Sequence, residues 1–485
     1  MLNKQPSGDM RNVIRTINEL PSDYSGHISV LLNDREPMVV ARNMILLGIL
    51  GKFNDVIAAD IAVHFWYSAF IPMEYNSFVC FACMKMMEDF QEESSWLSAK
   101  LGDNACVMGK LSIRTREVLS AAVTASLLSQ TEVADASKEL NRIRFEPFRK
   151  DRHDRWYTRL LPSHRLAALE FRRFGLVLPF GAANNRFNTP NNFLFGPGPR
   201  WLQDDLANPL DGWDMEAVIA AGQACGAKSE DLYGCLYFYL SGQLRSFAER
   251  LKRFHITFQL FDVDARNLSK DIQSGALAQC GVPKRTRFDH VDVSNIFDTE
   301  YVGIPNVLSD WAPLLNKKNP CATILGYSMN WVPKEPGARE PIDQRQIGRL
   351  AADLMARGKW HMLTDPTIMT CQTKYMTALY DNSVPWGNYL QKQGAEEAAR
   401  KAGVKRKEKH TIVSHRIGAP LGASSSTLPL HPNEDSWYWG EKRIGAPLGA
   451  SSSTLPLHPN EDSWYWGVQV STSLLTKRYL EFSRI

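Results

Sequence analysis

The sequence predicts an α/β fold built on a parallel β-sheet with crossover helices. Short apolar runs rich in β-branched residues predict strands at 27–34, 255–262, 288–295 and 321–327. Helical spacing of apolar residues predicts helices at 36–50, 58–70, 76–101, 115–128, 215–254 and 303–316. Because helices separate the predicted strands, the strands are expected to pair in parallel through crossovers.

Composition places the chain among ordinary globular proteins. Its 485 residues exceed the roughly 150 expected of one domain, and 44% of them are hydrophobic against 22% charged. The 56 basic and 52 acidic residues leave a net charge of +4, which argues against a dedicated nucleic-acid binder. The apolar stretches at 38–50 and 57–72 are too short or too polar to span a bilayer, and the polar start lacks a secretory signal. We therefore expect a protein with no membrane partner, located in the cytoplasm, with the nucleus as the alternative.

The eight cysteines do not form a metal-binding pattern. Only Cys80 and Cys83 make a CxxC pair, whereas a structural zinc site needs four ligands. The surrounding segment is apolar and helical, so two buried thiols on one helix are the expected arrangement. The absence of a disulfide framework fits a reduced, cytosolic setting. The sequence therefore predicts no metal site.

The chain divides into a core domain and two C-terminal regions. We assign 1–335 to one α/β domain with an insertion at about 75–254, in which 149–212 is expected to be a long loop. A helical extension follows at 336–395, and a tail at 396–485. The tail contains a charged run at 396–410, interpreted as a solvated segment, a nuclear localisation signal or a polyanion-binding patch. It also contains an unchanged duplication, 416–440 and 443–467, which receives no architectural weight.

A glycine turn near the start of the chain is the first candidate binding feature. Gly8 precedes a helical run at 10–20, and backbone N–H groups at such a turn can approach an anionic or polar cofactor. Asp34 ends the predicted strand at 27–34, where Rossmann-type sheets place an acid that binds ribose hydroxyls. No strand is predicted before Gly8, so the sheet is expected to lack its first strand. The alternative is an ordinary turn and an exposed aspartate.

Ser294 and Asn295 are the second candidate feature. They end the predicted strand at 288–295, and ligands of open α/β sheets bind outside the carboxyl ends of strands. Both side chains could donate or accept hydrogen bonds there. Serine and asparagine also favour turns at strand ends, and this alternative stays open.

Several segments resemble an uncharacterised fungal family, a domain of unknown function whose members often occur beside MYND-type zinc fingers. The resemblance covers roughly 7–331. It rests on Gly8–Thr16, Asn33–Asp34 with Val40–Asn43, His64–Ala69, Leu178–Gly181, Asn208–Trp213, Phe288–Asn295, Ile304–Pro305 and Trp311–Leu315. The family is similar to the N-terminal domain of a dynein axonemal assembly factor, which looks like a class I methyltransferase. The resemblance thus implies a Rossmann-like, methyltransferase-like sheet with a large helical and loop insertion.

The resemblance also implies where a cofactor would bind. Gly8, Asp34, Ser294 and Asn295 would border the methyltransferase-like pocket. No cofactor is assigned from the residues themselves; the resemblance implies S-adenosylmethionine as the candidate for such a pocket. No MYND finger can be assembled from the cysteines of this chain.

Residues in known catalytic patterns are missing from the sequence. It contains no GxSxG, HExxH or P-loop motif, so no catalytic residue is assigned and whether the chain is an enzyme stays open. The leading hypothesis is a non-catalytic, methyltransferase-like scaffold that engages protein partners. The alternative is an S-adenosylmethionine-dependent methyltransferase of unknown substrate, because methyl transfer needs positioning more than acid–base groups. A nucleic-acid binder acting through 396–410 is a third reading.

Overall fold

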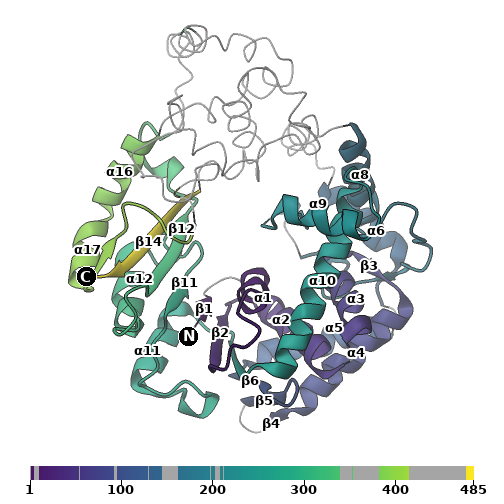
Figure 1. Cartoon of the computed structure of the whole chain (residues 1–485), viewed down its shortest axis with the longest axis horizontal. Coiled ribbons are helices and arrows are strands. Elements are labelled where there is room, and N and C mark those ends of the chain that lie inside the picture. The colour runs from purple at the N-terminus through teal and green to yellow at the C-terminus, as the bar shows by residue number, and fades with distance from the viewer. Residues whose placement is uncertain are drawn as a thin grey trace. The chain divides into compact units, whose positions relative to one another are not determined.

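The computed structural model is a mixed α/β protein (Figure 1). It describes residues 2–4, 10–53, 55–91, 96–128, 130–144, 162–196, 198–202, 208–210, 212–338, 352, 382–413, 415 and 477–485. The chain forms two compact units. Unit 1 comprises Met1–Glu146, Leu166–Asp292 and Leu314–Asn319, and unit 2 comprises Pro147–Arg165, Val293–Pro313 and Pro320–Ile485. Among the described residues, no helix is both long and apolar enough to cross a membrane.

Unit 1 contains a mixed sheet whose larger part is parallel. Its strands lie in the order β11-β1-β2-β10-β6-β5-β4. The first five pair in parallel, whereas β5 pairs antiparallel with both β6 and β4. The strands are β1 (Leu2–Lys4), β2 (Ile28–Asn33), β4 (Phe90–Gln91), β5 (Trp96–Lys100), β6 (Ala105–Lys110), β10 (Ile256–Phe261) and β11 (His290–Asp292).

Burial explains why the central strands read as continuous apolar runs. All six residues of β2 are buried, and five of the six in β10. A strand of a parallel sheet that is covered on both faces has no solvent-facing positions, so apolar residues do not alternate with polar ones. The predicted strands at 27–34 and 255–262 are confirmed, and the one at 288–295 is confirmed in a shorter form.

Among the described residues, nine α-helices lie entirely within unit 1. They are α1 (Arg11–Asn18), α2 (Pro37–Lys52), α3 (Asp55–Tyr67), α4 (Met73–Glu88), α5 (Ile113–Leu127), α6 (Val133–Arg144), α9 (Met215–Ala224), α10 (Leu232–Arg253) and α11 (Ala265–Ser274). Pro37 occupies the first turn of α2, where its missing N–H costs no hydrogen bond. The long helix α10 packs against α2, α3 and α9 (Figure 1). The helix predicted at 215–254 is therefore two helices, with Asp231 capping the second through the N–H of Gly234.

Two predictions about this sheet are wrong. A strand does precede Gly8: β1 pairs with β2 and β11, although its three residues form no apolar run that could predict it. The helix predicted at 76–101 ends at Glu88, after which the chain forms β4 and β5. The residues of β5 alternate between buried and more exposed positions, and β5 pairs with β6. Neither strand was predicted from the sequence. That alternation is the period of a strand with one solvated face.

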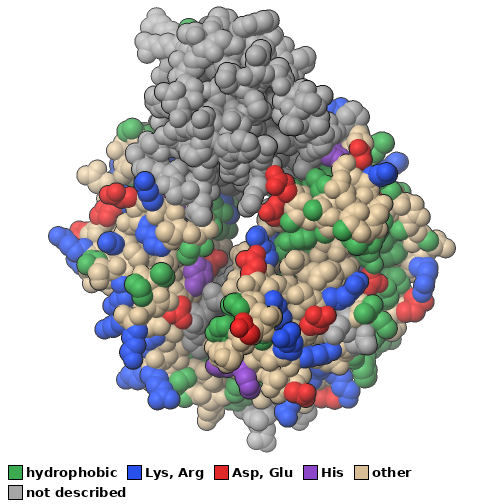
Figure 2. Space-filling model, viewed as in Figure 1, with side chains coloured by type: hydrophobic (Ala, Val, Ile, Leu, Met, Phe, Trp, Pro, Cys, Tyr) green, Lys and Arg blue, Asp and Glu red, His purple; other side chains and the backbone are tan. Residues whose placement is uncertain are grey.

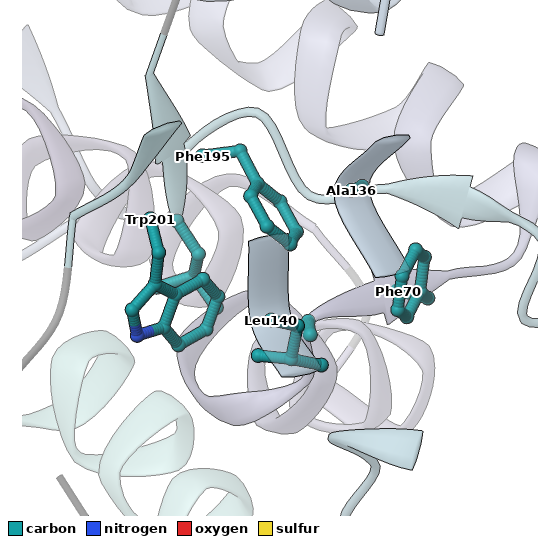
Figure 3. Close-up of a cluster of buried hydrophobic side chains, with 7 residues drawn as sticks. Phe70, Ala136, Leu140, Phe195 and Trp201 are labelled. Atoms are coloured by element: carbon teal, nitrogen blue, oxygen red, sulfur yellow. The ribbon is translucent and has the colours of Figure 1, made fainter. Parts of the chain in front are cut away.

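A small separate core of unit 1 gathers residues from distant segments (Figure 3). The helix α6 contributes Ala136 and Leu140, which pack with side chains of β3 (Phe70–Ile71), β8 (Phe195–Gly196) and β9 (Arg200–Trp201). The guanidinium of Arg144 lies over the rings of Phe171 and Trp201 and donates to the carbonyl of Phe171 at 2.7 Å. Burial lowers the pKa of Arg144 to about 9. Residues 149–212 were predicted to be loop, but they include the helix α8 (Pro162–Phe174).

Unit 2 contains three strands that pair antiparallel. The strand β14 (Arg478–Arg484) lies between β12 (Thr323–Ser328) and β13 (Val404–Arg406). The helices are α12 (Ile304–Trp311), α16 (Ser383–Lys392) and α17 (Ala395–Lys401). Phe482 of β14 packs against Phe297, and Trp331 packs against Trp386 of α16. The region set apart as a tail thus supplies α17, β13 and β14, while both copies of the duplication lie outside the described residues.

The two cysteines of the CxxC pair are buried on α4, as predicted. Burial raises the pKa of both thiols, that of Cys83 to about 12. A thiol that stays protonated is a poor nucleophile and a poor metal ligand. The described residues also include no group of three or more His, Cys, Asp or Glu side chains placed to hold a metal ion.

Candidate functional site

The carboxyl ends of β2 and β10 lie side by side in unit 1 and are joined by a side chain. Asn33, the last residue of β2, donates from Nδ2 to the carbonyl of Val263 at 2.9 Å. Its Oδ1 accepts the N–H of the same residue at 3.1 Å. The amide therefore ties the two loops that follow β2 and β10, using a donor and an acceptor of the same side chain.

Asp34 lies where the sequence predicts a ribose-binding acid, directly after β2. Its Oδ1 accepts the backbone N–H of Glu36 at 2.9 Å. Its own N–H donates to the carbonyl of Phe261 at 3.3 Å. The side chain is half-buried and forms the turn that leads into α2. Asp34 thus forms a turn, as the alternative interpretation expects, although its side chain is half-buried and not exposed.

Asp262, directly after β10, is the most heavily bonded acid at this edge of the sheet. Its carboxylate accepts the N–H of Ser112 at 2.9 Å and the hydroxyls of Ser112 and Thr115 at 2.5 Å each. Ser112 is also the N-cap of α5, because its Oγ accepts the N–H of Thr115. Asp262 thus fastens the end of β10 to the first turn of α5. The sequence analysis did not single out this group, although its position as the last residue of the strand predicted at 255–262 was a usable signal.

The other predicted site residues lie elsewhere. Gly8 lies outside the described residues. Ser294 and Asn295 lie in unit 2, where Ser294 is buried and donates from Oγ to the hydroxyl of Tyr327 at 3.0 Å. Asn295 contacts the sulfur of Met329, with 3.9 Å between Nδ2 and Sδ. The structure therefore places Ser294 and Asn295 together and Asp34 in the other unit.

Backbone geometry distinguishes Ser294 from its neighbours. Its φ of 50° is the left-handed conformation, and no other non-glycine residue among those described has a positive φ. Side chains with a Cβ adopt this region at a cost, and such residues cluster at functional sites. The serine occupies the turn that leaves β11.

A second polar cluster of unit 1, centred on Asp60, was missed. The carboxylate accepts hydrogen bonds from the hydroxyls of Tyr75 on α4 and Tyr237 on α10. Burial raises the pKa of both tyrosines, and their hydrogen bonds to Asp60 act in the same direction. Asp60 thereby links α3 to two other helices. The signal for this cluster was the spacing of Asp60 and His64, four residues apart on one helix.

His64 packs between the rings of Tyr75 and Tyr237 on the buried side of this cluster. Its Nδ1 lies 3.0 Å from the hydroxyl of Ser68, which also accepts the N–H of Val177. Burial lowers the pKa of His64 to about 4, and the nearby charge of Asp60 opposes this only in part. Ser68 is fully buried, so the pair cannot present a nucleophile to a substrate. The motif His64–Ala69 is therefore the packed, hydrogen-bonded end of α3 and the two residues that follow it.

Comparison with known proteins identifies one region of the chain. Residues 5–71 match the family described as Domain of unknown function (DUF4470). The matched stretch contains Asp34, Asp60, His64 and Ser68, and extends from the chain segment after β1 to β3. No curated protein and no solved structure matches the chain. The chain thus carries an uncharacterised domain at its start.

Proposed function

We propose that this chain is a non-catalytic, methyltransferase-like scaffold that engages protein partners. The observation that carries the proposal is the engagement of the polar groups at the carboxyl edge of the unit 1 sheet. Asn33, Asp34 and Asp262 each bond to a neighbouring loop or helix of the same chain. A cofactor site at this edge needs such groups directed at the ligand. Here they hold the loops of the protein.

Strand order supports the methyltransferase-like part of the proposal. When β6 is left out of the numbering, the parallel strands β1, β2, β10 and β11 lie in the arrangement 3-2-1-4 in chain order. This is the first part of the doubly wound order 3-2-1-4-5-6 of Rossmann-type sheets. The sheet departs from that order beyond β10, where β6, which precedes β10 in the chain, pairs with it in parallel. The antiparallel strands β5 and β4 then extend the sheet beyond β6.

Exposed apolar side chains support the interaction part of the proposal. Val56 and Ile57 on α3 are 59% and 56% exposed, and Phe81 on α4 is 45% exposed. The ring of Phe53, just before α3, lies 6.1 Å from that of Phe81, so these two aromatic side chains adjoin. Figure 2 shows hydrophobic side chains gathered on the right of the view, over the helices of unit 1. Exposed patches of this kind mark sites where proteins bind.

A specific observation favours the second candidate, an S-adenosylmethionine-dependent methyltransferase. The strand order reverses between β1 and β11, and ligands of doubly wound sheets bind at this switch point. Along the chain, the segment with Gly8 follows β1, and Ser294 and Asn295 follow β11. Three of the four residues predicted to bind a cofactor therefore follow the two strands of the switch point in the chain, and the fourth, Asp34, follows β2.

A methyl-transfer assay separates the two candidates. The full chain is incubated with S-adenosylmethionine carrying a labelled methyl group and with a mixture of cellular proteins and small molecules. The scaffold proposal predicts no transfer above that of a heat-denatured sample. Transfer that is lost in Asp34→Ala, but kept in the neighbouring control Glu36→Ala, would replace the scaffold with the methyltransferase.

A further inference from the structure

Two tyrosines face each other across neighbouring strands of unit 2. Tyr327 of β12 and Tyr479 of β14 are directly opposed in the antiparallel register. Directly opposed residues project from the same face of a sheet. Their ring centroids lie 5.4 Å apart with the planes inclined by 62°, so the rings form two adjoining walls. Both side chains are half-buried, and each keeps part of its surface open to solvent.

An ammonium group already occupies the space between these walls. The Nζ of Lys477 lies 3.6 Å from the centroid of Tyr327 and 4.8 Å from that of Tyr479. Lys477 precedes Tyr479 by two residues, and residues two apart on an extended chain project from the same side. The electronegative faces of both rings are therefore directed at a cation.

Ser294 fixes one wall of this arrangement. Its hydroxyl donates to the phenol oxygen of Tyr327 at 3.0 Å, and its carbonyl accepts the backbone N–H of the same residue at 2.7 Å. The left-handed φ of Ser294 positions both groups. A strained residue that orients one ring is a feature of preorganised binding sites.

We propose that Tyr327 and Tyr479 form a binding site for an alkylammonium group, in which Lys477 is a built-in occupant that a ligand displaces. Two aromatic walls and an on-face cation are the elements by which proteins bind ammonium ligands. The ligand is a methylated or unmodified lysine side chain of a protein, or a small free cation of the same chemistry. The site exists independently of the proposed scaffold role and of methyl transfer.

Opening the site tests the proposal. Tetramethylammonium is titrated into the full chain and followed by ligand-observed NMR, with Lys477→Met and Lys477→Gln as variants that remove the occupant. Both are expected to bind about tenfold more tightly than the unaltered chain. Lys405→Met, which removes an exposed lysine of β13, is the matched control and should leave the affinity unchanged. Circular dichroism verifies that each variant is folded.

Variants that lack either tyrosine ring test whether the rings form the binding site. Lys477→Met/Tyr327→Leu and Lys477→Met/Tyr479→Leu are each expected to lose the binding. Binding that survives in both double variants, or no gain in either single variant, would overturn the proposal. A trimethyllysine peptide identifies the source: at least tenfold tighter binding than tetramethylammonium indicates a protein ligand, and equal affinity indicates a small cation.

Discussion

In both units a carboxylate on or next to a strand accepts hydrogen bonds from a neighbouring segment of the chain. The acid follows the end of the strand in unit 1 and lies in the middle of the strand in unit 2. Asp262 follows the end of β10 and holds the first turn of α5. Glu481 lies in the middle of β14, is fully buried, and accepts the backbone N–H groups of Thr411, Ile412 and Val413 at 2.8–3.0 Å. Lys407 adds a contact of 3.1 Å to the same carboxylate.

The difference shows that an acid at a strand end is not by itself a ligand-binding group. In a parallel sheet each strand end leads into a helix, so the N-cap and turn acceptors of those helices gather where ligands are expected. In unit 2 the strands pair antiparallel, and the acid that holds the neighbouring segment, Glu481, is a residue of the strand β14 itself. The predictions below test how strongly each carboxylate is committed to structure.

Replacing Glu481 with Gln is expected to have the largest effect. The variant loses a charged acceptor and directs an amide N–H₂ at backbone N–H groups, which costs about 3 kcal/mol of unfolding free energy. Chemical denaturation followed by circular dichroism measures the difference. Glu408→Gln, an exposed change nearby in the chain, should shift stability by less than about 0.5 kcal/mol.

The effect of Glu481 is also expected to depend on pH. Burial alone would raise its pKa, but hydrogen bonds from the three N–H groups outweigh burial, and the pKa is lowered below its usual 4.5. A lowered carboxylate pKa stabilises the fold above the unfolded-state pKa and stops doing so as pH falls through the folded-state value. The difference in unfolding free energy between the unaltered chain and Glu481→Gln should therefore decrease as the pH falls below 4.5. A difference that stays constant to pH 2 would contradict this role.

The pH-dependent contribution of His64 in unit 1 is expected to be the next largest effect, and it is confined to acid pH. Its pKa is about 4 in the fold against 6.5 unfolded, so the unfolded chain binds a proton first as pH falls. Stability contributed by the neutral ring is complete above pH 6.5 and decreases toward pH 4, by about 2 kcal/mol at pH 5. The unfolding free energy of His64→Gln, measured by denaturation at several pH values, should not show this decrease between pH 6.5 and pH 4. The same slope in both proteins would show that the ring is not buried neutral.

Asp262→Ala should destabilise unit 1 by about 1 kcal/mol, because the acid is half-buried and water can replace some of its hydrogen bonds. Hydrogen exchange should report faster opening of the first turn of α5. Glu117→Ala, an exposed change on the same helix, serves as the control. An unchanged exchange rate at Thr115 would remove Asp262 as the group that holds this helix.

Asp34→Ala is expected to have the smallest effect, about 0.5 kcal/mol, since the half-buried side chain forms a local turn that water can partly stabilise in its place. Thermal unfolding of this variant and of Glu36→Ala provides the comparison. A loss above about 2 kcal/mol would indicate that Asp34 has a larger structural role than the turn.

The central strands and most helices could be predicted from the sequence, whereas the groups that hold them together could not. Apolar runs such as β2 carry their own signal because every residue of them is buried. The strand β1 has three residues and forms through its partners, so local pattern does not reveal it. Glu481 and Tyr479 acquire their roles from Thr411 and Tyr327, which are distant in the chain. The position of Asp34 at the end of a strand was predicted, but its hydrogen bond from the backbone N–H of Glu36 was not.

Calorimetric titration of the folded, full chain with S-adenosylmethionine tests the central claim most directly, with Asp34→Ala and Glu36→Ala titrated beside it. The scaffold account predicts no heat of binding in any of the three proteins, because the polar groups at the strand ends of unit 1 are engaged by the chain itself. Micromolar binding that weakens in Asp34→Ala and persists in Glu36→Ala would contradict the account and establish a working cofactor site.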